Sequence, residues 1–75
     1  MITLLYFGQI QSITSLPKEE IELVGNLDEL RTALLEKYPK LNEANFVFSV
    51  NQKITTACTL KEHDEVALLP PFSGG

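Results

Sequence analysis

The segment NLDELRTALLEKYP, residues 26–39, decides the fold because it predicts one amphipathic helix. Its apolar stripe recurs at helical spacing and consists of Leu27, Leu30, Leu34 and Tyr38, with Ala33 beside it. Asn26 is the expected N-cap, Glu29 completes a capping-box pattern, and Pro39 ends the helix. A single helix cannot bury its own apolar stripe, so the rest of the chain must supply a sheet for it to cover.

Strand-like segments precede this helix. Residues 2–7 are rich in β-favouring side chains and end at Gly8, which predicts a strand. A second predicted strand begins after Pro17 and alternates apolar residues with glutamates as far as Val24. Between the two strands, residues 9–15 predict a polar connection that contains a short turn of helix.

Further strands follow the helix. Residues 46–50 predict a strand, residues 51–53 a turn, and Ile54 the start of a return strand; a polar loop, residues 61–64, precedes a last apolar strand, residues 65–69. This order predicts an α+β fold of the ubiquitin-like β-grasp type, in which one main helix packs across one face of a mixed sheet of four to five strands. If the first and last strands pair at the centre, the C-terminal segment leaves from the middle of the sheet edge.

Length and charge limit the function classes. The 75 residues predict one domain, residues 1–69, followed by a flexible tail, residues 70–75. The net charge is -4 and the six basic residues are scattered, which argues against nucleic acid as a partner. No apolar stretch approaches the ~20 residues that span a membrane, and the single cysteine excludes an internal disulfide. We expect a cytoplasmic protein that begins with a strand rather than a targeting leader.

The tail carries the strongest chemical signal. Pro70 and Pro71 end the last strand and hold the exit extended, and at ~3.3 Å per residue the tail reaches about 20 Å. Gly74 and Gly75 lack Cβ atoms, so they fit a narrow channel and leave the terminal carboxylate sterically open. A carboxylate must be activated before a nucleophile attacks it, most simply as an acyl-adenylate made by an ATP-dependent enzyme. The tail therefore indicates acyl or sulfur carriage.

Four segments of the chain resemble the molybdopterin synthase small-subunit family. They are residues 5–10 (LYFGQI), 27–31 (LDELR), 50–52 (VNQ) and 64–75 (DEVALLPPFSGG). The resemblance spans the whole chain. Its last segment is the most specific, because the thiamine-pathway carrier shares the Gly-Gly end but usually lacks the two prolines before it.

This resemblance implies that Gly75 is adenylated by a ubiquitin-activating-type enzyme, which uses ATP, and is converted to a thiocarboxylate by a persulfide donor. The tail, with Phe72 and Ser73, would enter the large subunit of a heterotetrameric synthase and donate sulfur to cyclic pyranopterin monophosphate in molybdenum cofactor biosynthesis. The resemblance also implies that the chain is not an enzyme on its own, since the catalytic pocket belongs to the large subunit. We expect it to bind no cofactor and no metal.

The resemblance further implies a partner interface beside the tail, formed by Phe7, Ile54 and Leu69. The alternative is that these are ordinary core residues, and for Leu69 the two interpretations have equal weight. Phe72 replaces the smaller aliphatic residue common at this place, and either fills a partner pocket as an aromatic anchor or is merely tolerated.

Three other functions remain open at this point. A Gly-Gly end also serves sulfur carriers of the thiamine or tRNA-thiolation pathways. It serves ubiquitin-like protein modifiers as well, which would join Gly75 to a lysine of a target. The third alternative is an interaction module whose tail is frayed and inert.

The remaining chemistry-bearing residues predict ordinary roles. Cys58 is expected to be a small core hydrophobe rather than a persulfide acceptor. His63 lies in a polar loop without a second ligand or nucleophile, and Ser73 has no neighbouring base, so it is expected to be a spacer. A solvated strand face is expected for Glu19, Glu20 and Glu22.

Overall fold

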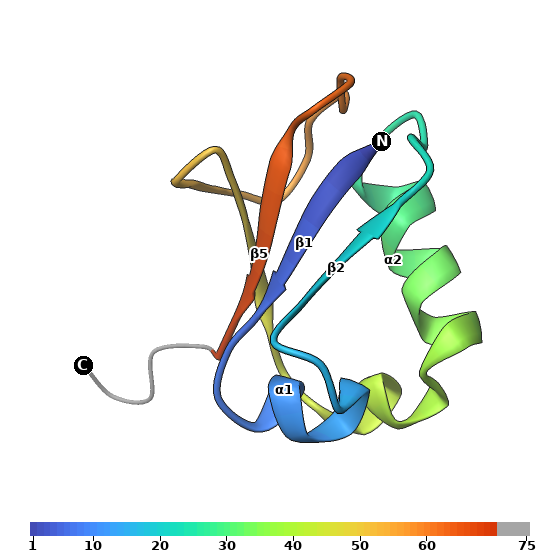
Figure 1. Ribbon diagram of the computed structural model, residues 1–75, viewed down its shortest axis with the longest axis vertical. Coiled ribbons are helices and arrows are strands. Elements are labelled where there is room, and N and C mark those ends of the chain that lie inside the picture. Colours follow the sequence, from blue (N-terminus) through green and yellow to red (C-terminus); the bar gives the residue numbers. More distant parts are fainter. Residues whose placement is uncertain (71–75) are drawn as a thin grey trace.

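The computed structural model describes residues 1–70, which form one mixed sheet with a single long helix, α2 (Leu27–Lys37), packed across one face (Figure 1). The sheet has five strands in the order β2-β1-β5-β3-β4. The strands are β1 (Ile2–Tyr6), β2 (Lys18–Ile21), β3 (Val47–Val50), β4 (Lys53–Thr55) and β5 (Glu65–Leu69). The predicted α+β, ubiquitin-like β-grasp fold is confirmed.

The first and last strands lie side by side at the centre of the sheet. β1 and β5 are parallel, with Leu4 opposite Val66 and Tyr6 opposite Leu68, and every other pair in the sheet is antiparallel. The pairing continues past β1, because the Phe7 N–H donates to the Leu68 carbonyl at 3.3 Å. The chain therefore leaves β5 from the middle of the sheet edge, as the sequence predicted for this pairing.

The local signals of α2 act as predicted. The Asn26 Oδ1 accepts a hydrogen bond from the Glu29 N–H at 2.9 Å, and the helix ends at Lys37 before Pro39. The proline also begins a 3₁₀ turn, η1 (Pro39–Glu43), because proline fits the first position of a helical turn. This turn was not predicted from the sequence. A short helix, α1 (Gln9–Thr14), stands where a helical turn was expected. None of the helices within residues 1–70 is long and apolar enough to cross a membrane.

Four strand boundaries differ from the prediction, those at the end of β1 and at the start of β3 by one residue only. The second strand was predicted to continue to Val24, but β2 ends at Ile21, because its partner Ile2 is the first residue of β1 and no strand lies beyond it. Leu23, beyond the end of the ladder, is 43% exposed.

The turn between β3 and β4 is one residue shorter than predicted. Asn51 and Gln52 alone form it, with φ values of 50° and 73°, and Lys53 already pairs with Val50. Two consecutive positive φ values in a two-residue hairpin loop match the type I′ turn, whose twist suits the flanking strands.

The core lies between α2 and the sheet. Its buried apolar residues are Ile2, Leu4, Tyr6, Ile10, Leu27, Leu30, Leu34, Leu41, Phe46, Phe48, Leu60, Val66 and Leu68. Cys58 is half-buried and packs against this core, which confirms its prediction as a small core hydrophobe. His63 is exposed in the loop before β5, as predicted.

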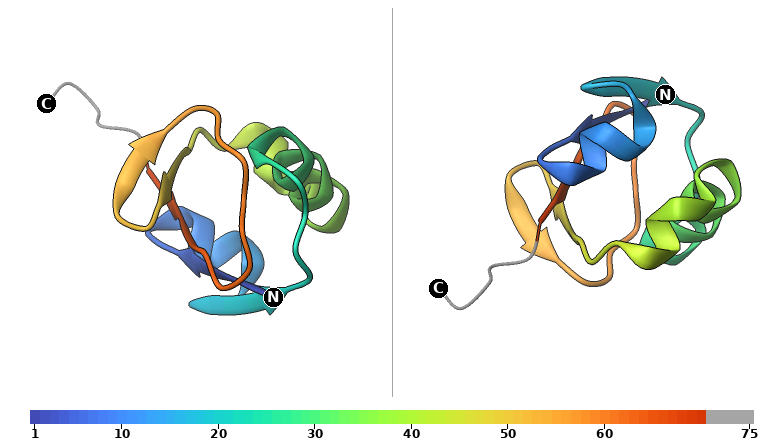
Figure 2. Two further views of the ribbon diagram at one scale, coloured as in Figure 1. Left: turned by 90° about the horizontal axis from the view of Figure 1, so that it is seen from above. Right: turned by 90° about the horizontal axis from the view of Figure 1, so that it is seen from below.

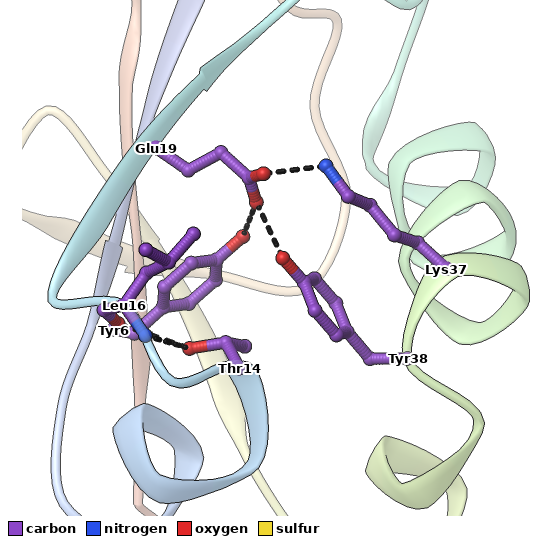
Figure 3. A network of polar contacts seen from close by, with 6 residues as sticks. All are labelled: Tyr6, Thr14, Leu16, Glu19, Lys37 and Tyr38. Atoms are coloured by element: carbon purple, nitrogen blue, oxygen red, sulfur yellow. Dashed lines mark hydrogen bonds and ion pairs between the residues drawn. The ribbon is translucent and has the colours of Figure 1, made fainter.

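The predicted solvated position of Glu19 is wrong. Its carboxylate accepts hydrogen bonds from the Tyr6 hydroxyl at 2.6 Å and the Tyr38 hydroxyl at 3.0 Å, and it forms an ion pair with Lys37 (Figure 3). Glu19 lies opposite Leu4, so its side chain points to the helix side of the sheet, whereas the neighbouring Glu20 is exposed. The carboxylate thus joins the edge strand β2 to the C-terminal end of α2.

The charge states in this network support one another. Burial raises the pKa of the Glu19 carboxyl, but the hydrogen bonds from its three partners together lower that pKa below its ordinary value. Burial and the adjacent carboxylate raise the pKa of the Tyr6 hydroxyl, and the bond to Glu19 raises the pKa of Lys37. At neutral pH the carboxylate is therefore ionised and its tyrosine donors are neutral, which makes their bonds charge-assisted.

We predict that Glu19→Gln lowers the free energy of unfolding by about 1–3 kcal/mol at neutral pH, because hydrogen bonds to a charged group are lost. Lys37 is half exposed, so its ion pair adds little. Since the folded-state pKa of Glu19 is depressed, its contribution is present above the unfolded-state pKa of about 4.3 and is lost as the pH falls through the folded-state value.

Urea unfolding from neutral to acidic pH measures both effects. Wild-type protein should lose more stability over this window than Glu19→Gln. The exposed neighbour Glu20 provides the matched control, because Glu20→Gln should unfold like wild type. An equal loss in the two variants would show that the network contributes nothing.

Candidate functional site

The face of the sheet that α2 leaves uncovered is the candidate functional site. Figure 2 shows α2 on one side of the sheet, where the alternate residues of the central strands, such as Leu4 and Leu68, are buried. Because side chains alternate along a strand, the residues between them point to the opposite, outer face. The strand register places Leu5, Ala67, Ser49 and Ile54 in one row across that face.

The three predicted interface residues lie at the end of the outer face where β5 leaves the sheet. Phe7 follows β1 and is 44% exposed, Ile54 lies on the edge strand β4 and is 57% exposed, and Leu69 ends β5 and is half-buried. All three have the strand parity of the outer face. The structure thus brings them onto one surface, and whether that surface binds a partner stays a prediction.

Three further residues of this surface were not predicted from the sequence: Leu5, Val47 and Ala67. Each alternates with a buried core residue along its strand, and each is partly exposed. The alternation of residues along each strand predicted that they point away from their buried neighbours. Which face of the sheet they share depends on the pairing register of the strands, which the sequence does not give. We name the six residues Leu5, Phe7, Val47, Ile54, Ala67 and Leu69 the outer patch.

The outer face is polar at its opposite end. Thr3 pairs with Glu20 on one side and with Glu65 on the other, and both glutamates are exposed. This row lies two residues along β1 from Leu5, which is about 7 Å at the rise of a strand. The apolar surface is therefore confined to the end of the sheet from which the tail departs.

Pro70 is the last described residue, and it packs against the turn after β1. Gly8 has a φ of 61°, and a Cβ placed on it would lie 3.5 Å from the Pro70 Cγ. Glycine at this position thus provides the positive φ of the turn and lets Pro70 approach its backbone. The contact starts the tail beside Phe7, at the edge of the outer patch.

The end of the chain that is predicted to react lies outside the described residues. The predicted tail residues concerned are Pro71, Phe72, Ser73, Gly74 and Gly75. Within residues 1–70, no three or more histidine, cysteine, aspartate or glutamate side chains are grouped so that they could hold a metal ion. The described part of the chain thus has an exposed apolar surface and, beside it, the point from which the tail leaves the sheet.

A family model described as the ThiS family matches residues 4–75. The molybdopterin synthase sulfur carrier subunit of Caenorhabditis briggsae is 32% identical over 81 aligned residues, which cover 99% of this chain and 96% of that protein. The protein of the same name from Arabidopsis thaliana is 31% identical and aligns with 99% of this chain and 82% of its own length.

Solved structures show the same fold. The putative molybdopterin converting factor subunit 1 of Pyrococcus furiosus superposes with a TM-score of 0.86 at 21% identity, covering 95% of this chain and 97% of that chain. A chain in the complex of subunits 1 and 2 of the molybdopterin-converting factor from Helicobacter pylori superposes with a TM-score of 0.73 at 28% identity, covering 99% of this chain and 97% of that chain.

The two faces of the sheet differ in their predicted tolerance of truncation. Ile54→Ala on the outer face should lower the free energy of unfolding by less than about 1 kcal/mol, because the side chain is mostly in water. Leu68→Ala removes a fully buried side chain from the other face and should cost about 2–5 kcal/mol. Chemical denaturation of the two variants measures the difference, and equal costs would show that Ile54 is packed as core.

Proposed function

This chain belongs to the ThiS family, and from this premise we propose that it is the sulfur-carrier small subunit of a molybdopterin synthase. The observation that carries the proposal is the match along 99% of the chain to curated molybdopterin synthase sulfur carrier subunits. The tail sequence, with two prolines before Phe72 and with Gly74 and Gly75 at its end, supports the same function, because glycines without Cβ atoms suit a carboxylate that must be activated in a narrow channel.

The proposed chemistry takes place at Gly75. An adenylating enzyme joins the Gly75 carboxylate to AMP from ATP and releases pyrophosphate. A persulfide sulfur then attacks the acyl carbon and displaces AMP, and a thiol reduces the resulting acyl disulfide to the thiocarboxylate. In the large subunit the thiocarboxylate sulfur takes the place of an oxygen on a carbon of cyclic pyranopterin monophosphate. Water then hydrolyses the resulting thioester, which leaves the sulfur on the pterin and returns Gly75 to the carboxylate. The carrier supplies the sulfur, and the large subunit supplies the catalytic pocket.

The geometry of the sheet supports this division of work. The outer patch and the exit at Pro70 are adjacent, so a partner that binds the patch receives the tail close to its own surface. A chain with the same fold occurs in the protein-protein complex of subunits 1 and 2 of the molybdopterin-converting factor from Helicobacter pylori. We propose that the outer patch of this chain contacts the large subunit of its synthase in a complex of the same kind.

The test of sulfur carriage is the intact mass of the full chain after charging by an adenylating enzyme, ATP and a persulfide donor. We expect a gain equal to the mass difference between sulfur and oxygen, assigned to Gly75 by fragmentation. A variant that lacks Gly74 and Gly75 should show no gain and should not support molybdopterin formation. Normal molybdopterin formation by the truncated chain would overturn the proposal.

The test of the docking surface is Ile54→Asp, which puts a charge into the most exposed apolar position of the outer patch. We expect the Kd for the large subunit to rise at least tenfold, because a charge buried without a partner opposes association. Leu23→Asp is the matched control, since Leu23 is also exposed but lies outside the patch. Equal losses in the two variants, measured by calorimetry, would argue against this surface.

The same experiments separate the other functions. A protein modifier would give covalent conjugates that survive denaturing gels and depend on Gly75. A carrier of the thiamine or tRNA-thiolation pathway would acquire sulfur at Gly75 but would not sustain molybdopterin formation with a large subunit. An inert module would be unaffected by loss of the two glycines.

A further inference from the structure

Asn51, in the turn between β3 and β4, forms hydrogen bonds with both the oxygen and the nitrogen of its side-chain amide to the residues where β5 begins. Its Oδ1 accepts a hydrogen bond from the Glu65 N–H at 3.0 Å, and its Nδ2 donates to the Asp64 Oδ1 at 3.0 Å. The Asn51 N–H also donates to the Glu65 carbonyl at 2.8 Å. One residue thus makes three bonds to two consecutive residues of a distant segment.

Asp64 extends this link into the loop before β5. Its second carboxylate oxygen accepts a hydrogen bond from the Lys61 N–H at 2.8 Å, so the carboxylate bridges Asn51 and the loop backbone. The bond from Asn51 and the backbone bond from Lys61 lower the pKa of Asp64, which keeps the carboxylate ionised at neutral pH. We name Asn51 and Asp64, with the bonds between them and their neighbours, the hairpin link.

The hairpin link matters because β4 is a short edge strand with a ladder on one side only. β4 is three residues long, pairs with β3 alone and forms one edge of the sheet. Its central residue is Ile54, the most exposed large apolar side chain within residues 1–70. Asn51 lies just before β4 in the chain, so the bonds that fix this turn also fix the direction in which β4 leaves it.

We propose that Asn51 is a positioning residue for partner docking: by tying the β3–β4 turn to Asp64 and Glu65, it holds Ile54 in the outer patch. This inference rests on the proposed function, in which the outer patch meets the large subunit. The bonds confine β4 to one arrangement before the partner arrives. Without these bonds β4 also adopts other arrangements, and the fraction of the carrier that is in the binding-competent arrangement falls.

Three variants separate the amide link from the turn. Asn51→Gly keeps the positive φ and removes the side-chain bonds. Asn51→Asp keeps the acceptor for Glu65 but places two carboxylates face to face. The double variant Asn51→Asp with Asp64→Asn exchanges donor and acceptor and restores the bridge. Gln52→Gly, at the other positive-φ position of the turn, is the control.

The full-length carrier variants are titrated with the large subunit by calorimetry, and hydrogen exchange is followed at residues 53–55. We expect Asn51→Gly and Asn51→Asp to raise the Kd about threefold or more and to speed amide exchange of residues 53–55 about tenfold. The exchanged pair should return both values to within about twofold of wild type. The defect of Asn51→Asp should also shrink at acidic pH, where one of the two carboxylates takes up a proton.

Each outcome has a defined meaning. Wild-type binding by Asn51→Gly, with or without faster exchange, overturns the inference and leaves the proposed function intact. Weak binding by the exchanged pair, although it is folded, also overturns the inference, because the amide bridge would not be the cause. If the wild-type carrier does not bind the large subunit at all, the proposed function fails and the inference fails with it.

Discussion

The parallel pairing of β1 with β5 is the constraint on which the rest of the molecule depends. It joins the two ends of the described chain at the centre of the sheet. Forming this one pairing closes a loop of nearly the whole domain and therefore carries the largest loop-closure entropy cost in the sheet. Every other strand is placed by reference to this pair, with β2 beside β1 and β3 beside β5. The pairing also fixes the position at which the tail departs, next to Phe7 and Gly8.

A sheet that is covered by its long helix on one face leaves the other face open to solvent. The chain covers one face of the sheet with α2, and on that face Leu4, Val66 and Leu68 are completely buried. Within residues 1–70 no second layer covers the outer patch, which is partly exposed at the end of the sheet from which the tail leaves. In the proposed function a partner covers this surface and receives the tail in the same event, so exposure of apolar side chains here suits a binding surface.

The parts of the fold that depend on nearby residues could be predicted from the sequence. α2 begins directly after Asn26 and ends two residues before Pro39, as these two residues predicted. β5 was equally predictable, because it is a short apolar run between a polar loop and a proline. The role of Glu19 could not be predicted, because a glutamate on an alternating strand faces solvent or core according to a register set elsewhere. Leu5 and Ala67 were missed for the same reason, whereas Ile54 was found through a resemblance and not through its pattern.

The two edge strands show how a small sheet is held by polar contacts that lie outside the outer patch. β2 is tied to α2 by Glu19, whose side chain points to the helix side, and β4 is tied to β5 by Asn51 at the tip of the hairpin. Short edge strands need such links, because each has a ladder on one side only. Both links lie away from the outer patch, so a partner that covers the patch does not have to break them. The free energy that holds the edges therefore does not compete with binding on the outer face.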